Sequence, residues 1–496
     1  MDPRIKVPFV LVLVETTLVV LFGVCVRFDT SLQPKSLRLS EDRESRVFNE
    51  YYPMFEDVHV MVYVGFGYLM TFLKRYGYGA VGYTLLLSAI VLQWAVLMRG
   101  IWQVRQAKVL LDVESLLGAE FSVVTFLISF GVVLGKTSVV QSTVMALVET
   151  AIGASNEYLG VQVFQAVDPG GSIFLHTFGA YFGLAVAVVI HQKDFVDHRN
   201  EGSVYTSDIF AMIGTLFLWL FWPSFNGASV HGAERHRAVV NTYLALTASC
   251  VAAFAVSSSV DDHGKFGMVH VQNSTLAGGV AIGTTANIMA DPHSAIIVGS
   301  VAGVISALGY KYLTPFLARR WKIHDTCGVN NLHGMPGLLA GLISIIVAAV
   351  VSTDTHGESL YLMYPARVPQ ANSTEFLALN TSVAFQPGAG RSNGDQAVFQ
   401  LWALLSTVTI AISGGIATGH FDDLWLSFFF CFLLRLSCFD PVEVHGFFDD
   451  TLAWDVAGPE LPIFVEVKPR RQSPQRRPLR FKTRVRAIMQ NSRTQH

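Results

Sequence analysis

Two stretches of the sequence place an aspartate and a histidine eight residues apart. Residues 168–176 read DPGGSIFLH and residues 325–333 read DTCGVNNLH, so both follow the pattern Asp-x-x-Gly-x-x-x-Leu-His, and each leads into a long apolar run. A carboxylate suits the start of a helix, where it accepts backbone N–H groups. An imidazole in an apolar segment offers a hydrogen-bond donor, an acceptor or a proton carrier. The pattern indicates one chemical arrangement that is built twice.

Composition indicates the environment in which these groups act. The 496 residues are 51% hydrophobic and 15% charged, whereas soluble domains carry about 25% charged residues. The formal net charge of −2 argues against nucleic acid as a partner. We therefore expect an all-α polytopic membrane protein, because contact with lipid removes the need for a charged outer surface.

Apolar runs of about 20 residues predict about twelve transmembrane helices. Arg4 and Lys6 precede the first run like the basic end of a signal peptide. However, Glu15 interrupts that run and no small-x-small cleavage site follows, so we interpret it as a retained span. The spans are expected at about 7–26, 55–76, 78–98, 114–135, 138–160, 170–191, 208–225, 237–259, 267–288, 292–314, 329–352 and 396–419.

The two Asp–His stretches enter the sixth and eleventh spans, which run in opposite directions because they are five spans apart. This predicts an inverted five-helix repeat, about 55–191 and 208–352, with a site between the halves. Eight helical residues rise about 12 Å, and the apolar core of a bilayer is about 30 Å thick. If the aspartates mark opposite surfaces, His176 and His333 lie near the middle, within reach of each other.

The depth of these groups separates two kinds of role. Ionisable side chains in the middle of a bilayer are functional by default, and this applies to the two histidines. For Asp168 and Asp325, helix capping is a sufficient explanation. Attraction of cations is an additional role that stays open for Asp168.

Charge and sequons predict the topology. Lysine and arginine gather clearly only in the C-terminal stretch VKPRRQSPQRRPLRFKTRVR, which places that end in the cytoplasm, and twelve spans then place the N-terminus there too. We divide the chain into a channel domain, 1–436, and a cytoplasmic tail, 437–496, which we expect to be disordered at its end. The loop at about 353–395 falls outside and carries glycosylation sequons at Asn372 and Asn380.

Two other patterns do not indicate a ligand. GVVLGKTS, residues 131–138, has three residues between its glycine and Gly-Lys, whereas a phosphate loop needs four. We interpret Lys136 as a marker of the cytoplasmic face. Gly-x-x-x-Gly motifs, which let helix backbones approach, are interpreted as packing and occur at Gly179/Gly183, Gly279/Gly283, Gly299/Gly303 and Gly337/Gly341.

Several stretches resemble the Rh glycoproteins of the Amt/MEP/Rh ammonia-channel family. They are FEDVHVMVYVGFGYLMTFL, VLGKTS, GGSIFLHTFGAYFGL, GTLFLWLFWPSFN, VHVQNSTLAGGVAIGT and CGVNNLHGMPG, and they extend over spans two to eleven. FFDDTLAWDV is similar to the acidic–tryptophan tail of the same proteins. The resemblance implies an ammonium transporter-like fold and a homotrimer in the plasma membrane, with lipid around it and one pore through each subunit.

The resemblance also implies roles for individual residues. They are pore histidines at His176 and His333 and outer-gate phenylalanines at Phe121 and Phe225. Asn226, beside Phe225, also matches the family, and Asp168 matches an acid in the vestibule near the pore. Two features depart from the family pattern. Glu120 stands before the first gate residue where we would expect aspartate, and HFDDLWLSFFFCF, residues 420–432, reads as an insertion after the last span.

The implied substrate is ammonia that arrives as ammonium. A narrow apolar pore sorts by charge, because a bare cation is costly at mid-bilayer and neutral ammonia is not. Alternatives are an electrogenic transporter in which the histidines relay the proton separately, and a non-transporting membrane scaffold. Carbon dioxide is a further candidate solute. The residues indicate no enzyme, metal or cofactor, since two histidines alone make a poor metal site and no nucleophile stands in a recognisable setting.

Overall fold

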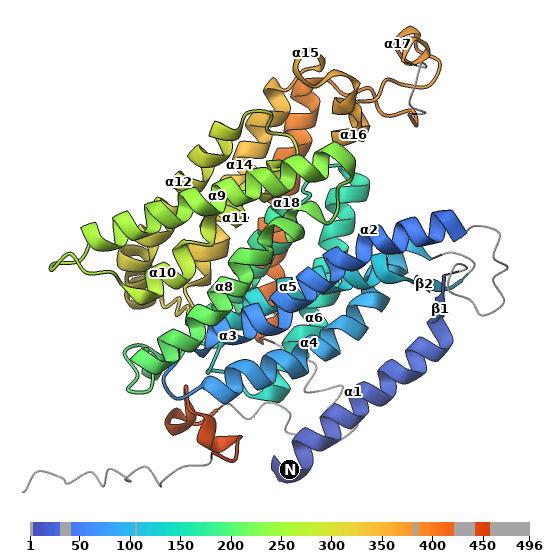
Figure 1. Cartoon of the computed structure of the whole chain (residues 1–496). Helices are drawn as coiled ribbons and strands as arrows, with labels where there is room; N and C mark the ends of the chain where they lie inside the picture. The colour runs from blue at the N-terminus through green and yellow to red at the C-terminus, as the bar shows by residue number, and fades with distance from the viewer. Residues whose placement is uncertain (1–2, 30–40, 105–106, 380–384, 421–441, 457–496) are drawn as a thin grey trace, which may run out of the picture. The chain divides into compact units, whose positions relative to one another are not determined.

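The structure is a computed structural model that describes residues 3–29, 41–104, 107–379, 385–420 and 442–456 (Figure 1). By their contacts, residues up to Trp454 form one unit. The second unit, Asp455–His496, lies almost wholly outside the described residues. The same is true of the expected insertion at 420–432 beyond its first residue, and of the expected domain boundary at 436/437.

Within the described residues, nine helical segments are long and apolar enough to cross a bilayer. They are α1 (Pro3–Cys25), α4 (Gly77–Gly100), α5 (Val113–Val133), α7 (Phe178–Val189) with the π-helical turn before it (Ser172–Thr177), α8 (Tyr205–Gly227), α9 (Gly232–Ser259), α12 (Pro292–Leu308) with its continuation through α13 (Thr314–Phe316), α14 (Met335–Val350) with its π-helical start (Asn330–Gly334), and α18 (Asn393–His420).

Three further segments correspond to the remaining predicted spans. They are α2 (Glu41–Val60) with its continuation through a π-helical stretch (Met61–Phe66) and α3 (Gly67–Leu69), α6 (Val139–Tyr158), and the pair α10 (Met268–Ser274) and α11 (Ala277–Ile282). The prediction of about twelve membrane helices is confirmed. The start of the second span differs, since its helix begins at Glu41 rather than near residue 55.

The loop expected at about 353–395 contains only short helices in its described part. These are α15 (Thr353–His356), α16 (Leu360–Met363) and α17 (Thr374–Ala378). Asn372 is exposed just before α17, whereas Asn380 lies outside the described residues. The loop is fastened to the membrane helices by Arg391, whose guanidinium donates to the carbonyl of Phe164 at 2.7 Å.

One small element is not helical. The strands β1 (Val26–Phe28) and β2 (Val109–Leu111) pair in parallel, with Val26 opposite Val109. Aliphatic and β-branched side chains favour this extended pairing, which the sequence did not reveal because each strand has only three residues. The pairing joins the end of α1 to the chain between α4 and α5 (Figure 1). Most of α1 is otherwise unburied, as expected for a span that faces lipid.

Both expected repeats, about 55–191 and 208–352, are represented among the remaining helices. Each half contains a helix that starts inside the protein: one begins at Ser172 and the other at Asn330. These two starts contact each other, and each continues into a long apolar helix, α7 or α14. The fold therefore places the ends of two half-helices at the centre of the described bundle.

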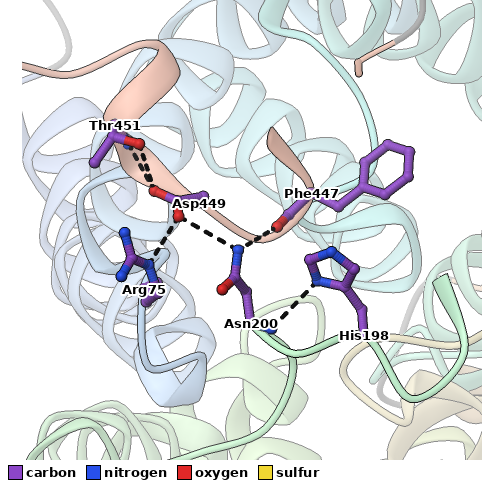
Figure 2. A network of polar contacts seen from close by, with 6 residues as sticks. All are labelled: Arg75, His198, Asn200, Phe447, Asp449 and Thr451. Atoms are coloured by element: carbon purple, nitrogen blue, oxygen red, sulfur yellow. Dashed lines mark hydrogen bonds and ion pairs between the residues drawn. The ribbon is translucent and has the colours of Figure 1, made fainter. Parts of the chain in front are cut away.

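Residues 442–454, which we call the tail segment, are held against the bundle by a polar network (Figure 2). Asp449 accepts a hydrogen bond from the Arg75 guanidinium at 2.8 Å and one from the Asn200 amide at 3.3 Å. The Asn200 amide also donates to the carbonyl of Phe447 at 3.1 Å. Although burial opposes ionisation of Asp449, the hydrogen bonds it accepts outweigh burial and hold its pKa below the usual value. Asp449 is therefore an anion at neutral pH.

The neighbouring acid, Asp450, caps α4, a helix that lies near the opposite end of the chain. Its carboxylate accepts the backbone N–H groups of Tyr78 at 2.8 Å and Gly79 at 2.7 Å, in the first turn of α4. Burial raises the pKa of Asp450. Helix N-termini favour a negative charge and need acceptors for their first N–H groups. Asp450 thus links the position of the tail segment to the start of a membrane helix.

We expect Asp450→Ala to loosen the tail segment. Loss of an N-cap acceptor costs about 0.5–2 kcal/mol, which raises the population of the open segment roughly two- to thirtyfold. Chymotrypsin should then cut faster between Phe447 and Phe448, which are fully buried. Glu443→Ala is the matched control, because the Glu443 side chain is 78% exposed. Equal cleavage rates in the two variants would contradict a capping role for Asp450.

Candidate functional site

The half-helix that carries His176 is capped by Asp168. The Asp168 carboxylate accepts the backbone N–H groups of Ser172 and Phe174, both at 2.9 Å. It also accepts the hydroxyl of Thr284, from the other half of the protein, at 2.6 Å. Both of its oxygens are therefore engaged, which supports the capping explanation of this acid.

The second half repeats this arrangement around His333. The Asp325 carboxylate accepts the backbone N–H groups of Val329 at 2.9 Å and Asn330 at 2.8 Å. The two acids thus have the same local function, each at the start of a half-helix. The repeated pattern in the sequence corresponds to a repeated cap in the structure.

The two histidines, which we call the His pair, come together between the halves. His176 Nδ1 lies 3.1 Å from His333 Nδ1, and the rings are nearly parallel, with centroids 5.1 Å apart. Both side chains are buried, at 1% and 3% exposure. This is the approach that the inverted repeat predicts from sequence positions 157 apart.

The contact between the rings decides what the His pair offers to a third molecule. A hydrogen bond between two Nδ1 atoms needs a proton on one of them and a lone pair on the other. In a pair of neutral rings, the ring that donates through Nδ1 keeps a lone pair on Nε2, and the ring that accepts carries its proton on Nε2. The pair therefore presents one donor and one acceptor, and His176 Nε2 is buried without a partner among the described residues.

Aromatic rings continue on both sides of the His pair. Phe121 and Phe225, which we call the Phe pair, meet edge to face with centroids 5.0 Å apart. Phe225 lies 5.7 Å from the His176 ring, and Phe66 stacks on the other side at 6.2 Å from the His333 ring. The structure brings together four of the six residues that the family resemblance singled out, in the order Phe pair, His176, His333.

Trp222 is a neighbour of the His pair that the sequence did not identify. WPSFN reads as an interfacial aromatic cluster, yet the Trp222 side chain is 1% exposed and stacks on His176, with centroids 5.7 Å apart. A Cβ on Gly279 would lie 2.8 Å from the indole nitrogen, so only glycine leaves room for this ring. The sequence spacing could have indicated this position, because Trp222 and Phe225 are three residues apart and therefore lie on the same face of a helix.

Asn226, next to the Phe pair, joins three helices. Its buried amide donates to the Thr242 hydroxyl on α9 at 2.9 Å and to the Gly279 carbonyl on α11 at 3.0 Å. Its Oδ1 atom is buried without a hydrogen-bond partner among the described residues. Hydrogen bonds between helices, such as the two that its amide nitrogen donates, hold membrane helices together. Through these contacts Asn226 holds α8, the helix that carries Phe225, against α9 and α11.

Lys136 differs from a surface marker, because its side chain is 4% exposed. Its ammonium donates to the carbonyl of His324 at 2.5 Å, and His324 Nε2 contacts the Glu201 carboxylate at 2.9 Å. Burial lowers the pKa of Lys136 to about 8. The motif GKTS therefore supplies a buried basic group to a polar cluster near Asp325. The negative charge of Asp325 raises the pKa of Lys136 and so partly opposes the effect of burial.

These features define a class of protein: a polytopic membrane transporter whose site lies between inverted halves. The model of the Ammonium Transporter Family matches residues 17–427. The chain therefore belongs to the Ammonium Transporter Family, among its Rh-type members.

Curated relatives and solved structures agree with this placement. The chain is 43% identical to the ammonium transporter Rh type B of Danio rerio over 92% of its length and 94% of the relative. It is 42% identical to the ammonium transporter Rh type C of Rattus norvegicus, over 91% of its length and 87% of the relative. Among solved structures, Rh50 of Nitrosomonas europaea covers 84% of this chain, with a TM-score of 0.66 at 31% identity and 94% of its own chain matched.

Proposed function

We propose that this member of the family is an ammonia channel that conducts neutral ammonia past the Phe pair and the His pair. Family membership supports ammonia and ammonium as the substrate. The observation that carries the proposal is the buried contact between His176 and His333, with Nδ1 atoms 3.1 Å apart. A bare cation at mid-bilayer costs from about 3 to more than 10 kcal/mol, depending on the method, whereas neutral ammonia has no such cost.

In the proposed path, the two pairs act in sequence. The Phe pair removes water from the arriving solute and offers a cation–π surface worth about 1–2 kcal/mol to ammonium. Ammonium leaves its proton on the outer side. The His pair then supplies one donor and one acceptor, which replace hydrogen bonds that ammonia loses when it leaves water. The rings stay neutral in this scheme because burial disfavours their charged forms.

A second candidate is electrogenic transport. The hydrogen bond between the two Nδ1 atoms of the His pair would let a proton pass from ring to ring, so that proton and ammonia cross separately and net charge moves. Carbon dioxide is a further candidate solute, since a narrow apolar path admits small neutral gases. Carbon dioxide does not need the hydrogen-bond donor and acceptor of the His pair in order to pass, whereas ammonia does. We therefore rank ammonia first.

The proposal includes a cellular setting. The protein lies in the plasma membrane as a homotrimer surrounded by lipid, with both termini in the cytoplasm and the Phe pair on the outer side. Residues 1–436 form the channel domain and 437–496 the cytoplasmic tail. A glycan is carried by Asn372, which is exposed in the outer loop, or by Asn380, which lies outside the described residues. Asp168 helps to draw cations toward the outer opening.

The test measures flux and current in one reconstituted preparation. Vesicles that contain the protein and a pH-sensitive dye are exposed to an ammonium gradient, and the same protein is placed in a planar bilayer. We expect faster alkalinisation than in protein-free vesicles and no ammonium-dependent current. A current proportional to flux would favour the electrogenic alternative, and the absence of flux would favour a scaffold.

A further inference from the structure

The helix α2 is bonded to both helices that carry the Phe pair. It packs against α5 and α8, which hold one phenylalanine each. In both cases the residue just before the phenylalanine makes the bond. The Glu120 carboxylate contacts His59 Nδ1, and the Ser224 hydroxyl donates to the Asp57 carboxylate at 2.5 Å. Because His59 and Asp57 are two residues apart, one turn of α2 holds both members of the pair.

The two partners of the His59–Glu120 contact differ in exposure. The Glu120 side chain is 1% exposed, whereas the His59 side chain is 44% exposed. Glu120 Oε2 has no hydrogen-bond partner among the described residues, so the imidazole is the group that compensates the buried carboxylate. The His59 ring lies between Phe55 and Tyr63, with centroids 5.2 and 4.6 Å away, which fixes its direction toward Glu120.

The surroundings of His59 make its protonation state matter. The titratable groups that face it are Glu120 from α5 and Tyr63 from α2 itself, while toward α8 the Asp57 carboxylate is occupied by Ser224. An imidazolium holds a carboxylate by charge and by a hydrogen bond, and a neutral imidazole only by a hydrogen bond. The bond to a carboxylate is already charge-assisted when the imidazole is neutral, so protonation of His59 adds the attraction of a full positive charge. The ring is partly exposed and lies about one helix turn from residue 55, the expected outer end of the second span, so we take it to exchange protons with the outer solution.

We propose that His59 and Asp57 are positioning residues for the Phe pair, and that protonation of His59 tightens the hold on Phe121. Rings whose centroids lie 5.0 Å apart edge to face are in contact, so a solute passes between them only when one ring turns. A firmer hold on the helix beside Phe121 makes that turn rarer. The inference rests on the proposed function, because it concerns the rate at which ammonia passes the Phe pair.

The test is ammonia flux into vesicles between about pH 5.5 and 8.5, the range in which histidine titrates. The concentration of neutral ammonia is held constant, so that substrate supply does not change with pH. Wild-type flux should fall roughly two- to fivefold toward acid pH. His59→Gln keeps an amide that donates to Glu120 but takes up no proton. Its flux should be the same at every pH.

His231→Gln is the matched control. His231 Nδ1 contacts the Glu50 carboxylate of the same helix α2 at 2.6 Å, but both side chains are exposed. This variant should keep the wild-type response to pH. Asp57→Ala, which frees Ser224, should raise flux at every pH and leave the response to pH unchanged. If the flux of this variant equals that of the wild type, Asp57 is not a positioning residue.

The outcomes separate this inference from the proposed function. Equal pH profiles for the wild type and His59→Gln, with flux present in both, overturn the role of His59 alone. Wild-type vesicles without flux above the protein-free level reject the channel instead. Gel filtration of each variant in detergent checks that it is folded. We expect His59→Gln to fold, because the His59 side chain is partly exposed.

Discussion

His176→Leu combined with His333→Leu is expected to lower ammonia flux roughly ten- to a hundredfold. Both leucines preserve an apolar interior, so the change removes hydrogen bonding and little else. A polar molecule that has left water and finds no partner loses about 1–3 kcal/mol, and each 1.4 kcal/mol corresponds to about a factor of ten in rate. The initial rate of vesicle alkalinisation under an ammonium gradient measures the effect.

The single substitutions should each produce most of this loss. Because the rings bond to each other through Nδ1, either leucine leaves the remaining ring without its partner, and the effects should not add. His263→Leu serves as the control, since His263 is exposed in the turn after α9. Wild-type flux in the double variant would show that the His pair is not in the path of ammonia.

The approach of the two histidines could be predicted because local rules are sufficient for it. An aspartate at a helix start fixes where each half-helix begins, and eight residues of helix set the depth of each imidazole. An odd number of spans between the two patterns makes the helices antiparallel. None of these steps needs knowledge of how distant helices cross. The caps at Asp168 and Asp325 follow from the same rules, and the structure shows both.

The neighbours of these groups depend on helix crossings, which no local pattern encodes. Phe66 reaches His333 only because α2 continues through a π-helical stretch beside the second half of the protein. The contact between His59 and Glu120 joins positions 61 residues apart on different helices. Lys136 is similar, since its local sequence resembles a membrane boundary and its burial comes from His324, 188 residues later.

Gly299→Ala is expected to destabilise the protein strongly. A Cβ at this position would lie 2.1 Å from the carbonyl oxygen of Ala245, where α12 packs against α9. The obstacle is backbone, so a change of rotamer cannot relieve it, and the two helices must move apart. Overpacking of this kind costs about 1–3 kcal/mol or more. The temperature at which the detergent-solubilised protein loses its monodisperse gel-filtration peak should fall.

Two variants test whether the contact itself is responsible. Gly23→Ala makes the same chemical change on α1, where a Cβ meets nothing within 4 Å. It should leave stability unchanged or raise it slightly, because alanine favours helix by about 1 kcal/mol over glycine. Ala245→Gly should not rescue Gly299→Ala, since the clash is with the carbonyl oxygen and not with the alanine methyl. Rescue by Ala245→Gly, or wild-type stability of Gly299→Ala, would mean that α9 and α12 do not approach through their backbones. The Gly-x-x-x-Gly motif at Gly299/Gly303 would then need another explanation.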